Sequence, residues 1–405
     1  MDASHVSAMS PAALKGMRVV EMGQLIAGPF CGKILGEFGA EVIKIEPPGA
    51  GDPLRNWRMI KNGTSVWWQV QSRNKRSLAL DLRTPEGQDI ARQLIAKADV
   101  LIENFRPGTL EKWGMGWDDL RQLNPGLVML RISGYGQTGP YRDLPGFGAI
   151  GEAMGGLRHL TGEPGRVPLR VGVSIGDTLA ALHGTIGVMI ALYHRKVNGG
   201  AGQVIDVALN EAVFNVMESL IPEYSVFGAV REAAGSALPG IAPSNAYPCS
   251  GGHVLIAGNG DSIFRRLMET IGRADLASAP DLQSNAGRVA RAAELDAAIE
   301  AWTHTRRLDK VLAALSAAGV PAGRVYTAKD IHEDPHYRAR DMILRQQTRD
   351  GYALDVPGIV PRLSATPGSV RSSAPRLGDD TDSVLQEMGF SARDVAALRA
   401  KGAIA

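Results

Sequence analysis

The sequence predicts an α/β fold whose core is a doubly wound parallel sheet. Short apolar stretches alternate with stretches of helical periodicity through Leu209. Strand–helix–strand units favour parallel neighbours, because a helical crossover returns the chain to the same end of the sheet. Ligands of such sheets bind at the carboxyl ends of the strands. The length of 405 residues exceeds what one core usually holds, so we expect more than one domain.

The first such unit lies near the start of the chain. Met17–Met22 is a short apolar stretch typical of a buried strand, and Glu41–Glu46 resumes as a second strand. Between them, Gly28 and Pro29 open a segment with helical periodicity that continues through Phe38. We expect these two strands to lie in one parallel sheet.

Further strands and helices follow. Thr84 is a suitable N-cap, and Pro85 and Glu86 suit the first turn of a helix that we expect to reach about Lys97. The other expected elements are helices at Asp118–Leu123 and Thr178–Arg195 and strands at Ser77–Leu82, Val100–Asn104, Leu127–Ser133 and Gln203–Leu209. The residues expected on the buried face of the long helix are Leu179, Leu182, Ile186, Met189, Ile190 and Tyr193.

The second half of the chain differs in character. Gly228–Pro248 is rich in Ala, Gly, Ser and Pro, which predicts a linker. A second unit, with helical stretches such as Leu308–Ala317, continues to about Pro321. Beyond it we expect strand-like pieces and two short amphipathic helices, at Thr381–Glu387 and Ala392–Arg399.

Composition excludes several classes of protein. The formal net charge of +2 is too small for an electrostatic nucleic-acid footprint. Two cysteines, Cys31 and Cys249, cannot form a disulfide framework and indicate a reducing compartment. We find no apolar run near the ~18 residues that a membrane span needs, and no secretory leader. We therefore expect a cytoplasmic enzyme.

The segment Gly134–Gly139 reads GYGQTG and follows an expected strand. A dinucleotide site would need a helix to begin here, with its N-terminus facing a pyrophosphate. Pro140 and a polar, loop-like stretch follow instead. We therefore expect a flexible turn that faces the substrate, and not a nicotinamide site.

The segment Gly172–Gly176 reads GVSIG, the pattern of a hydrolase nucleophile elbow around Ser174. An elbow needs a preceding strand, for which Leu169–Val171 is the candidate, and a distant acid and histidine. No histidine has a context that marks it as a triad base, and no glycine-rich oxyanion loop follows an early strand. A serine hydrolase stays an alternative of a different class.

Asp177 stands near the N-terminus of the helix that follows this segment. An aspartate there caps backbone N–H groups and suits the helix dipole. The same environment keeps a carboxylate ionised, so that it can act as a nucleophile and form an acyl-enzyme. The two interpretations are compatible, since the N–H groups that stabilise the carboxylate could also hold an oxyanion.

Other charged residues give weaker signals. His332 and His336 have an i,i+4 spacing, but Pro335 separates them and no HExxH pattern is present, so we expect a surface turn and no metal. A phosphate clamp is a hypothesis for the basic residues near expected strand ends, namely Arg73, Lys75, Arg76, Arg83 and Arg106.

Taken together, these segments resemble the class III CoA-transferase family, which includes formyl-CoA transferase and carnitine CoA-transferase. The resemblance covers nearly the whole chain. Its landmarks are Ala27–Pro29, Leu35-Gly36, Gly39–Glu46, Gly51-Asp52 with Arg55, Arg73–Ser77, Glu103–Gly108, Gly134–Gly136, Gly176-Asp177 and Leu377–Thr381.

The resemblance implies a chemistry for Asp177. In this family the corresponding aspartate attacks an acyl-CoA thioester and gives a mixed anhydride and free CoA thiolate. The thiolate then gives an enzyme thioester, and an acceptor carboxylate receives CoA through a second anhydride. No cofactor is bound permanently, because the CoA thioester is itself the substrate. The site must exclude water while the intermediates last.

The resemblance also implies CoA contacts. They carry over to Ile26, Ala27, Leu80, Arg83, Asn104, Phe105, Arg106, Lys112, Ile132, Ser133, Gly134 and Tyr135, with Gln24 near the acyl group. A family arginine that binds CoA phosphates falls at Pro47 here, so the clamp is expected to use Arg55, Arg83 or Arg106. The glycine-only active-site loop of formyl-CoA transferase has no equivalent.

The family fold implies a Rossmann-like large domain built from both chain ends, a smaller α+β middle domain, and an interlocked homodimer. The boundaries that we expect are residues 1–210 for the N-terminal part of the large domain, 211–248 for a helix and linker, 249–322 for the small domain and 323–405 for a linker and the C-terminal part.

The sequence leaves the exact reaction open. Related α-methylacyl-CoA racemases use a histidine–aspartate pair where this chain has Phe147-Gly148, which cannot transfer a proton. The stretch Pro145–His183 most resembles transferases that use succinyl-CoA and C4–C6 dicarboxylates such as citramalate, malate, mesaconate, itaconate or glutarate. Arg158 and Arg170 are candidates, by position, for binding a second carboxylate.

Overall fold

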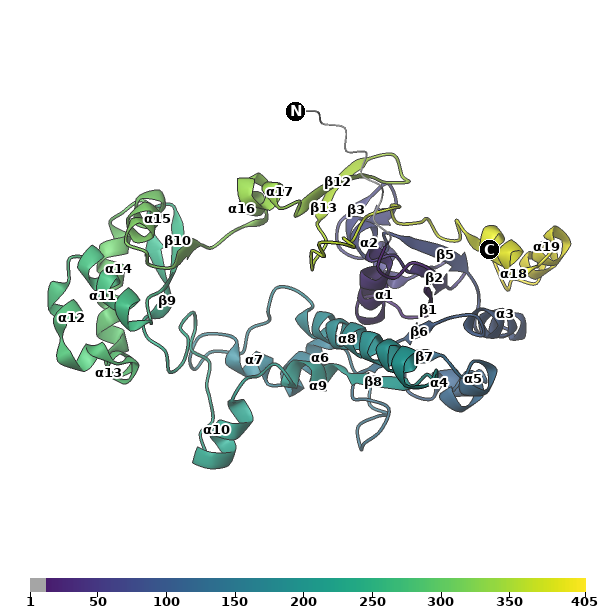
Figure 1. The fold of residues 1–405 in the computed structure, drawn as a ribbon, viewed down its shortest axis with the longest axis horizontal. Helices are drawn as coiled ribbons and strands as arrows, with labels where there is room; N and C mark the ends of the chain where they lie inside the picture. The colour runs from purple at the N-terminus through teal and green to yellow at the C-terminus, as the bar shows by residue number, and fades with distance from the viewer. Residues whose placement is uncertain (1–11) are drawn as a thin grey trace. The chain divides into compact units, whose positions relative to one another are not determined.

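The computed structural model describes residues 12–405, which form two compact units (Figure 1). The larger unit combines the described residues up to Leu157 with Val171–Leu220 and Ala339–Ala405. The smaller unit consists of Arg158–Arg170 and Ile221–Arg338. It is longer than the small domain expected at 249–322, and its first segment was not indicated by any boundary in the sequence.

The core of the larger unit is a sheet of six strands in the order β5-β2-β1-β6-β7-β8, and every neighbouring pair is parallel. In chain order the strands are third, second, first, fourth, fifth and sixth, which is a doubly wound arrangement. The strands are β1 Arg18–Glu21, β2 Glu41–Glu46, β5 Lys75–Ala79, β6 Val100–Glu103, β7 Val128–Ser133 and β8 Val204–Ala208. The predicted parallel sheet is thereby confirmed.

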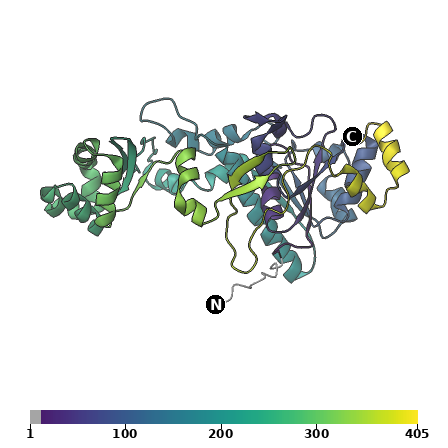
Figure 2. The same cartoon turned by 90° about the horizontal axis from the view of Figure 1, so that it is seen from above.

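Helices cover both faces of this sheet (Figure 2). One face packs against α1 (Ala27–Glu37) and α8 (Ile175–Asn198). The helices on the other face are α3 (Pro85–Ile95), α5 (Trp117–Leu123), α18 (Thr381–Met388) and α19 (Ala392–Ala400). Because both faces are covered, the strands are almost continuously buried, as parallel sheets require.

Local sequence signals place most element boundaries. The Thr84 hydroxyl caps α3 by accepting from the Gly87 N–H at 3.1 Å, and Pro85 is the first helical residue, as predicted. Strand β5 begins two residues before the expected Ser77. It also ends earlier, at Ala79: Leu80 forms an isolated bridge with Ile404, and Asp81 begins the turn that leads to the cap.

The buried face of α8 differs from the predicted one. Small residues face the sheet, among them Ala180, Ala181 and Gly184. A Cβ at Gly184 would lie 2.8 Å from a methyl carbon of Leu130, so the helix is too close to the sheet for larger side chains. Five of the six residues predicted as buried are exposed by 40% or more, namely Leu182, Ile186, Met189, Ile190 and Tyr193. The helical periodicity of apolar residues is present, but the large apolar side chains lie on the exposed face of α8 and not on the face that packs on the sheet.

The expectation that no segment is long and apolar enough to cross a membrane is also wrong. By length and composition α8 could do so, with a mean hydropathy of 1.5 in its most apolar window. In this fold, however, one face of α8 packs on β7 and β8 and contributes to the core. Its apolar composition is that of a core helix with an unusually apolar outer face.

The smaller unit has its own antiparallel sheet and core. The sheet order is β11-β10-β9, with β9 Ser244–Cys249, β10 Gly252–Ala257 and β11 Ala322–Arg324. Packed with it are α11 Asp261–Thr270, α12 Ala274–Ser278, α14 Ala292–His304 and α15 Leu308–Ala317. The bounds of α15 are those predicted, whereas β9 occupies the end of the expected linker at Gly228–Pro248.

Shorter elements complete the chain. They are η1 Pro53–Asn56, β3 Ile60–Lys61, β4 Thr64–Ser65, α2 Val66–Gln71, α4 Thr109–Lys112, α6 Gly148–Met154, α7 Leu157–Leu160, α9 Leu209–Phe214, α10 Leu220–Phe227, η2 Pro280–Gln283, α13 Asn285–Ala290, α16 Ala328–Glu333, α17 Pro335–Ala339, β12 Ile343–Gln347 and β13 Ala353–Pro357. The C-terminal segment is fastened to the sheet edge, where the Ser77 N–H donates to the Asp380 carboxylate at 2.9 Å.

Candidate active site

A cavity of about 310 Å³ lies within the larger unit, next to the point where the strand order reverses between β1 and β6. Ligands of doubly wound sheets bind at such a point, since the loops that leave the two strands diverge there. The lining residues come from the loops after β1 and β6, the end of β7, the segment before α6, and the beginnings of α8 and α9. They are Gln24–Ala27, Asn104–Pro107, Ile132–Gly134, Arg142, Leu144–Gly148, Asp177 and Leu209.

The two loops at the reversal point are held together by a reciprocal pair of hydrogen bonds. The Gln24 N–H donates to Asn104 Oδ1 at 2.8 Å, and Asn104 Nδ2 donates to the Gln24 carbonyl at 2.9 Å. Gly23 allows this approach, because a Cβ there would lie 3.3 Å from Asn104 Oδ1. Asn104 therefore fixes the relative position of two walls of the cavity.

Asp177 is the third residue of α8 and is half-buried. Its carboxylate lies against the first residue of α6, because a Cβ built on Gly148 would be 2.0 Å from Asp177 Oδ2. The N-terminal turn of a helix favours the ionised carboxylate. The side chain is thus in a position that suits both capping and nucleophilic attack, and it lines a cavity of substrate size.

The nucleophile elbow around Ser174 does not form. Residues 168–174 contain no strand, so the strand–turn–helix geometry that an elbow requires is absent. Ser174 instead precedes the first residue of α8 and is not among the residues that line the cavity. The hydrolase alternative loses its structural basis.

The GYGQTG segment forms a loop, as expected, and no helix begins there. The next helix is α6, which starts at Gly148. The two ends of the loop meet at glycines, since a Cβ on Gly134 would lie 2.9 Å from the Gly146 Cα. Within the loop the rings of Tyr135 and Tyr141 meet edge to face at 5.9 Å, and the Gln137 N–H donates to Asp206 at 2.8 Å.

The structure brings many of the predicted contact residues together. Those that line the cavity are Gln24, Ile26, Ala27, Asn104, Phe105, Arg106, Ile132, Ser133 and Gly134, together with Asp177. Leu80, Arg83, Lys112 and Tyr135 do not line it. Arg83 is exposed and pairs with Asp81 at 2.8 Å. CoA contact stays a prediction for all of these residues.

Arg55 has a different environment from the one expected for a phosphate clamp. Its guanidinium donates twice to Glu46, at 2.8 Å each, and lies over the Trp68 ring at 3.7 Å. Arg73 and Lys75 are likewise buried, the first against Glu37 and the second paired with Glu21 at 2.8 Å. These ion pairs account for the three cations, so we assign them to the fold and not to a clamp.

The sequence did not indicate several lining residues. Arg142 and Leu144 lie in a stretch whose composition is typical of a polar surface loop. Leu209 is the first residue of α9, directly after the last strand of the sheet. Arg106 and Arg142 are the arginines that line the cavity. Among residues 12–405 no group of three or more His, Cys, Asp or Glu side chains could hold a metal ion, and His332 and His336 are both exposed.

Glu103, at the end of β6, supports the loop that carries Asn104–Arg106. Its carboxylate accepts from Arg131 at 2.7 Å and from the Phe105 N–H at 2.8 Å. Burial raises the pKa of Glu103 to about 7, although Arg131 and the Phe105 N–H act in the opposite direction. Arg131 also pairs with Glu111 at 2.6 Å, so it is shared between two carboxylates.

Comparison with known proteins identifies the class. Residues 14–381 match CoA-transferase family III. The chain is 49% identical over 397 residues to the succinyl-CoA–D-citramalate CoA-transferase of Chloroflexus aurantiacus, covering 97% of this chain and 98% of that protein. It is 34% identical over 384 residues to the succinate–glutarate CoA-transferase of Agrobacterium fabrum, covering 93% and 95%.

Solved structures agree. A CAIB/BAIF family protein from Brucella suis superposes with a TM-score of 0.83 at 35% identity, covering 93% of this chain and all of that one. A hypothetical protein, Rv3272, from Mycobacterium tuberculosis gives 0.81 at 28% identity, covering 93% and 99%. The chain therefore belongs to CoA-transferase family III, and it is an enzyme that uses CoA thioesters as substrates.

We expect Gly148→Ala to lower kcat by about tenfold to a hundredfold, because the new methyl group displaces the Asp177 carboxylate and small displacements of reacting groups are costly. Steady-state kinetics of CoA transfer measures this. Gly323→Ala is the control, since its Cβ meets nothing within 4 Å and its φ is ordinary. Equal kcat values for the two variants would contradict the prediction.

We expect Glu103 to make folding stability depend on pH. The folded state retains a proton that the unfolded chain releases above its ordinary pKa of 4.5, so the stabilisation is lost as pH rises from about 4.5 through 7. The unfolding free energy of the wild type relative to Glu103→Gln should fall by up to about 3 kcal/mol between pH 5 and pH 8. Urea denaturation at several pH values measures it.

Glu387→Gln is the control for that experiment. Hydrogen bonding to Arg76 lowers the pKa of Glu387, so its contribution is already complete above pH 5 and should not change up to pH 8. A Glu103→Gln difference that is as flat as that of Glu387→Gln would show that Glu103 is ionised throughout this range.

Proposed function

We propose that this protein transfers CoA from succinyl-CoA to a free dicarboxylate of four to six carbons through covalent intermediates on Asp177. The observation that carries the proposal is the placement of the Asp177 carboxylate in the wall of the cavity at the reversal point of the sheet. The relatives support the substrate class. Their names specify succinyl-CoA with D-citramalate, L-malate or mesaconate, and succinate with glutarate.

The proposed reaction begins with two steps on the donor. The Asp177 carboxylate attacks the thioester carbonyl of succinyl-CoA, the carbon–sulfur bond breaks, and the products are an aspartyl–succinyl anhydride and CoA thiolate. The thiolate then attacks the aspartyl carbonyl of the anhydride. Succinate leaves, and the enzyme holds CoA as an aspartyl thioester.

Two further steps mirror the first two. The acceptor carboxylate attacks the aspartyl thioester and expels the thiolate, giving an aspartyl–acyl anhydride. The thiolate attacks the acyl carbonyl, which forms the new acyl-CoA and releases the Asp177 carboxylate. Each step exchanges one activated acyl group for another, so the reaction requires that water be kept from the cavity.

The residues of the cavity suit these steps. The first turn of α8 favours the ionised form of Asp177, which is the nucleophilic form. Gly148 leaves room for the carboxylate, whereas a side chain there would collide with it. Arg106 and Arg142 are the cations available to CoA phosphates and to the second carboxylate of a dicarboxylate. Arg158 and Arg170, which belong to the smaller unit, stay candidates by position for the second carboxylate.

We expect Asp177→Asn to lower kcat by about a thousandfold or more, because an amide cannot attack the thioester. Wild-type protein incubated with succinyl-CoA should give hydroxylamine-sensitive succinyl or CoA adducts on the peptide that contains Asp177, detected by mass spectrometry. The variant should give none.

Ser174→Ala is the control for Asp177→Asn, and it should retain transfer and form the same adducts. Full transfer activity in Asp177→Asn would show that the carboxylate only caps the helix. Labelling of Ser174 by a fluorophosphonate would instead support a hydrolase.

We also propose that the active form is the interlocked homodimer implied by the family resemblance. The outer face of α8 supports a partner, because Ile186, Ile190, Tyr193 and Val197 are each more than half exposed and follow one another along one side of the helix. A stripe of this kind is typical of an interaction surface. A second copy of the chain is the occupant that we propose.

We expect Ile190→Glu to lower the fraction of dimer that assembles when denatured protein refolds, because it places a charge in the centre of the apolar stripe and because interlocked subunits cannot separate without unfolding. Sedimentation velocity of the refolded protein measures this fraction. Leu123→Glu is the control, since Leu123 is 46% exposed on α5 and lies outside the stripe. A wild-type protein that is monomeric at micromolar concentration would contradict the proposal.

A further inference from the structure

The loop after β1 contains a strained residue at the edge of the cavity. Leu25 has a φ of +64°, in the left-handed region that residues other than glycine, asparagine and aspartate rarely adopt. It lies between Gln24 and Ile26, and all three line the cavity together with Asp177. Leu25 and its two neighbours therefore form one wall of the cavity.

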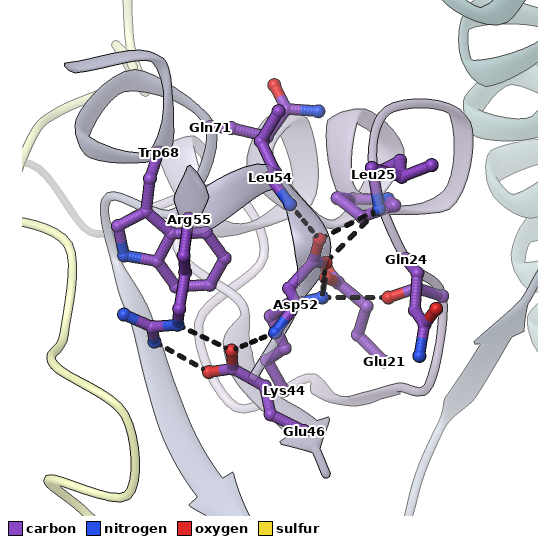
Figure 3. Close-up of polar contacts among 12 residues, drawn as sticks. Glu21, Gln24, Leu25, Lys44, Glu46, Asp52, Leu54, Arg55, Trp68 and Gln71 are labelled. Carbon is purple, nitrogen blue, oxygen red and sulfur yellow. Dashed lines mark hydrogen bonds and ion pairs between the residues drawn. The ribbon is translucent and has the colours of Figure 1, made fainter. Parts of the chain in front are cut away.

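The carboxylate of Asp52 holds Leu25 in this conformation (Figure 3). The Leu25 N–H donates to both oxygens of Asp52, at 3.1 and 3.2 Å. Asp52 is 1% exposed and is not among the residues that line the cavity, so it contacts the turn from behind. Its link to the site is the backbone of Leu25.

Asp52 is itself fixed by a buried set of charges. Lys44 Nζ lies 2.8 Å from Asp52 Oδ2, the Leu54 N–H donates to Oδ1 at 2.9 Å, and the Asp52 N–H donates to Glu46 at 3.0 Å. Burial acts to raise the pKa of Asp52, but Lys44 and the N–H donors lower it below its ordinary value. The carboxylate is therefore ionised and cannot rotate without breaking several contacts.

Lys44 connects the same network to the residue before the turn. Its ammonium donates to the Gly23 carbonyl at 2.7 Å and to Glu21 at 3.0 Å. Lys44 and Asp52 thus hold the backbone on both sides of Gln24, while Asn104 binds Gln24 itself. Each residue of the turn Gly23–Leu25 is therefore bound through its backbone by a side chain from elsewhere in the chain.

We infer that Asp52 is a positioning residue for CoA transfer, which acts by holding Leu25 in the left-handed conformation and thereby setting Gln24 and Ile26 against the reacting acyl group. The inference rests on the function proposed above, and it adds a residue outside the cavity to the machinery. The same turn in a relaxed conformation would change the wall of the cavity that Gln24 and Ile26 form, although Asp52 itself does not line the cavity.

The sharpest test substitutes Leu25 itself. Asparagine tolerates the left-handed region, whereas β-branched valine does not, although valine preserves more of the apolar contact with Leu54 and Trp68. If the conformation matters, Leu25→Val should lower kcat about tenfold more than Leu25→Asn. If Leu25 serves only as packing, the order is reversed, and that result would overturn the inference.

A second test removes the Asp52 charge. Asp52→Asn should lower kcat at least about tenfold with a smaller change in the KM for succinyl-CoA, because the turn faces the same cavity as Asp177. Adding Leu25→Asn should restore part of the loss, since asparagine needs less support at φ +64°. Asp380→Asn is the control: it removes a carboxylate that also accepts a backbone N–H, outside the cavity, and should lower stability without lowering kcat.

A readout other than activity separates this inference from the proposed function. Amide hydrogen exchange of the peptide that contains Leu25 should accelerate in Asp52→Asn, and not in Asp380→Asn, whatever reaction the enzyme catalyses. If wild-type protein transfers no CoA to any dicarboxylate, the proposed function fails while the exchange result stands. If Asp52→Asn is folded and has the wild-type kcat, the positioning role is overturned. If Asp52→Asn does not fold, the Leu25→Asn and Leu25→Val pair decides.

Discussion

The reversal of strand order between β1 and β6 is the constraint on which the rest of the larger unit depends. It separates the loops that leave two adjacent parallel strands, and the space between them becomes the cavity. Asn104 joins the two loops, and Asp177 reaches the same space from a helix that packs on the sheet. The proposed nucleophile, many of the predicted contact residues and the strained turn at Leu25 all line this cavity.

Buried charge is the second organising feature. Lys44, Lys75 and Asp52 are almost completely enclosed, and each has a partner of opposite charge. Replacing such pairs by apolar residues is often neutral for stability, so ion pairs of this kind are weak evidence for stabilisation. Here the ion pairs fix the positions of their partners. The ammonium of Lys44 contacts the Gly23 carbonyl and the Asp52 carboxylate, and both belong to the contacts that shape the turn after β1.

Periodicity and capping residues predicted most of the fold. The strand at Glu41–Glu46, the cap at Thr84 and the helix at Leu308–Ala317 were found where the sequence indicated. The buried face of α8 could not be found this way, because its large apolar side chains are exposed and small residues form the face that packs on the sheet. Arg142 was missed for a related reason: nothing local distinguishes an arginine in a surface loop from one in a cavity wall. Arg55 was expected in a phosphate clamp, but it pairs with Glu46, and local sequence does not indicate that tertiary contact.

The glycines of α8 allow the helix to approach the sheet closely. Gly184 and Gly187 have no methyl group where one would lie 2.8 Å from Leu130 and from Ile205. Alanine at these two positions would press on the side chains of Leu130 and Ile205, which would have to shift. The close approach of α8 to β7 and β8, on the helix whose first turn carries Asp177, therefore depends on glycine at both positions.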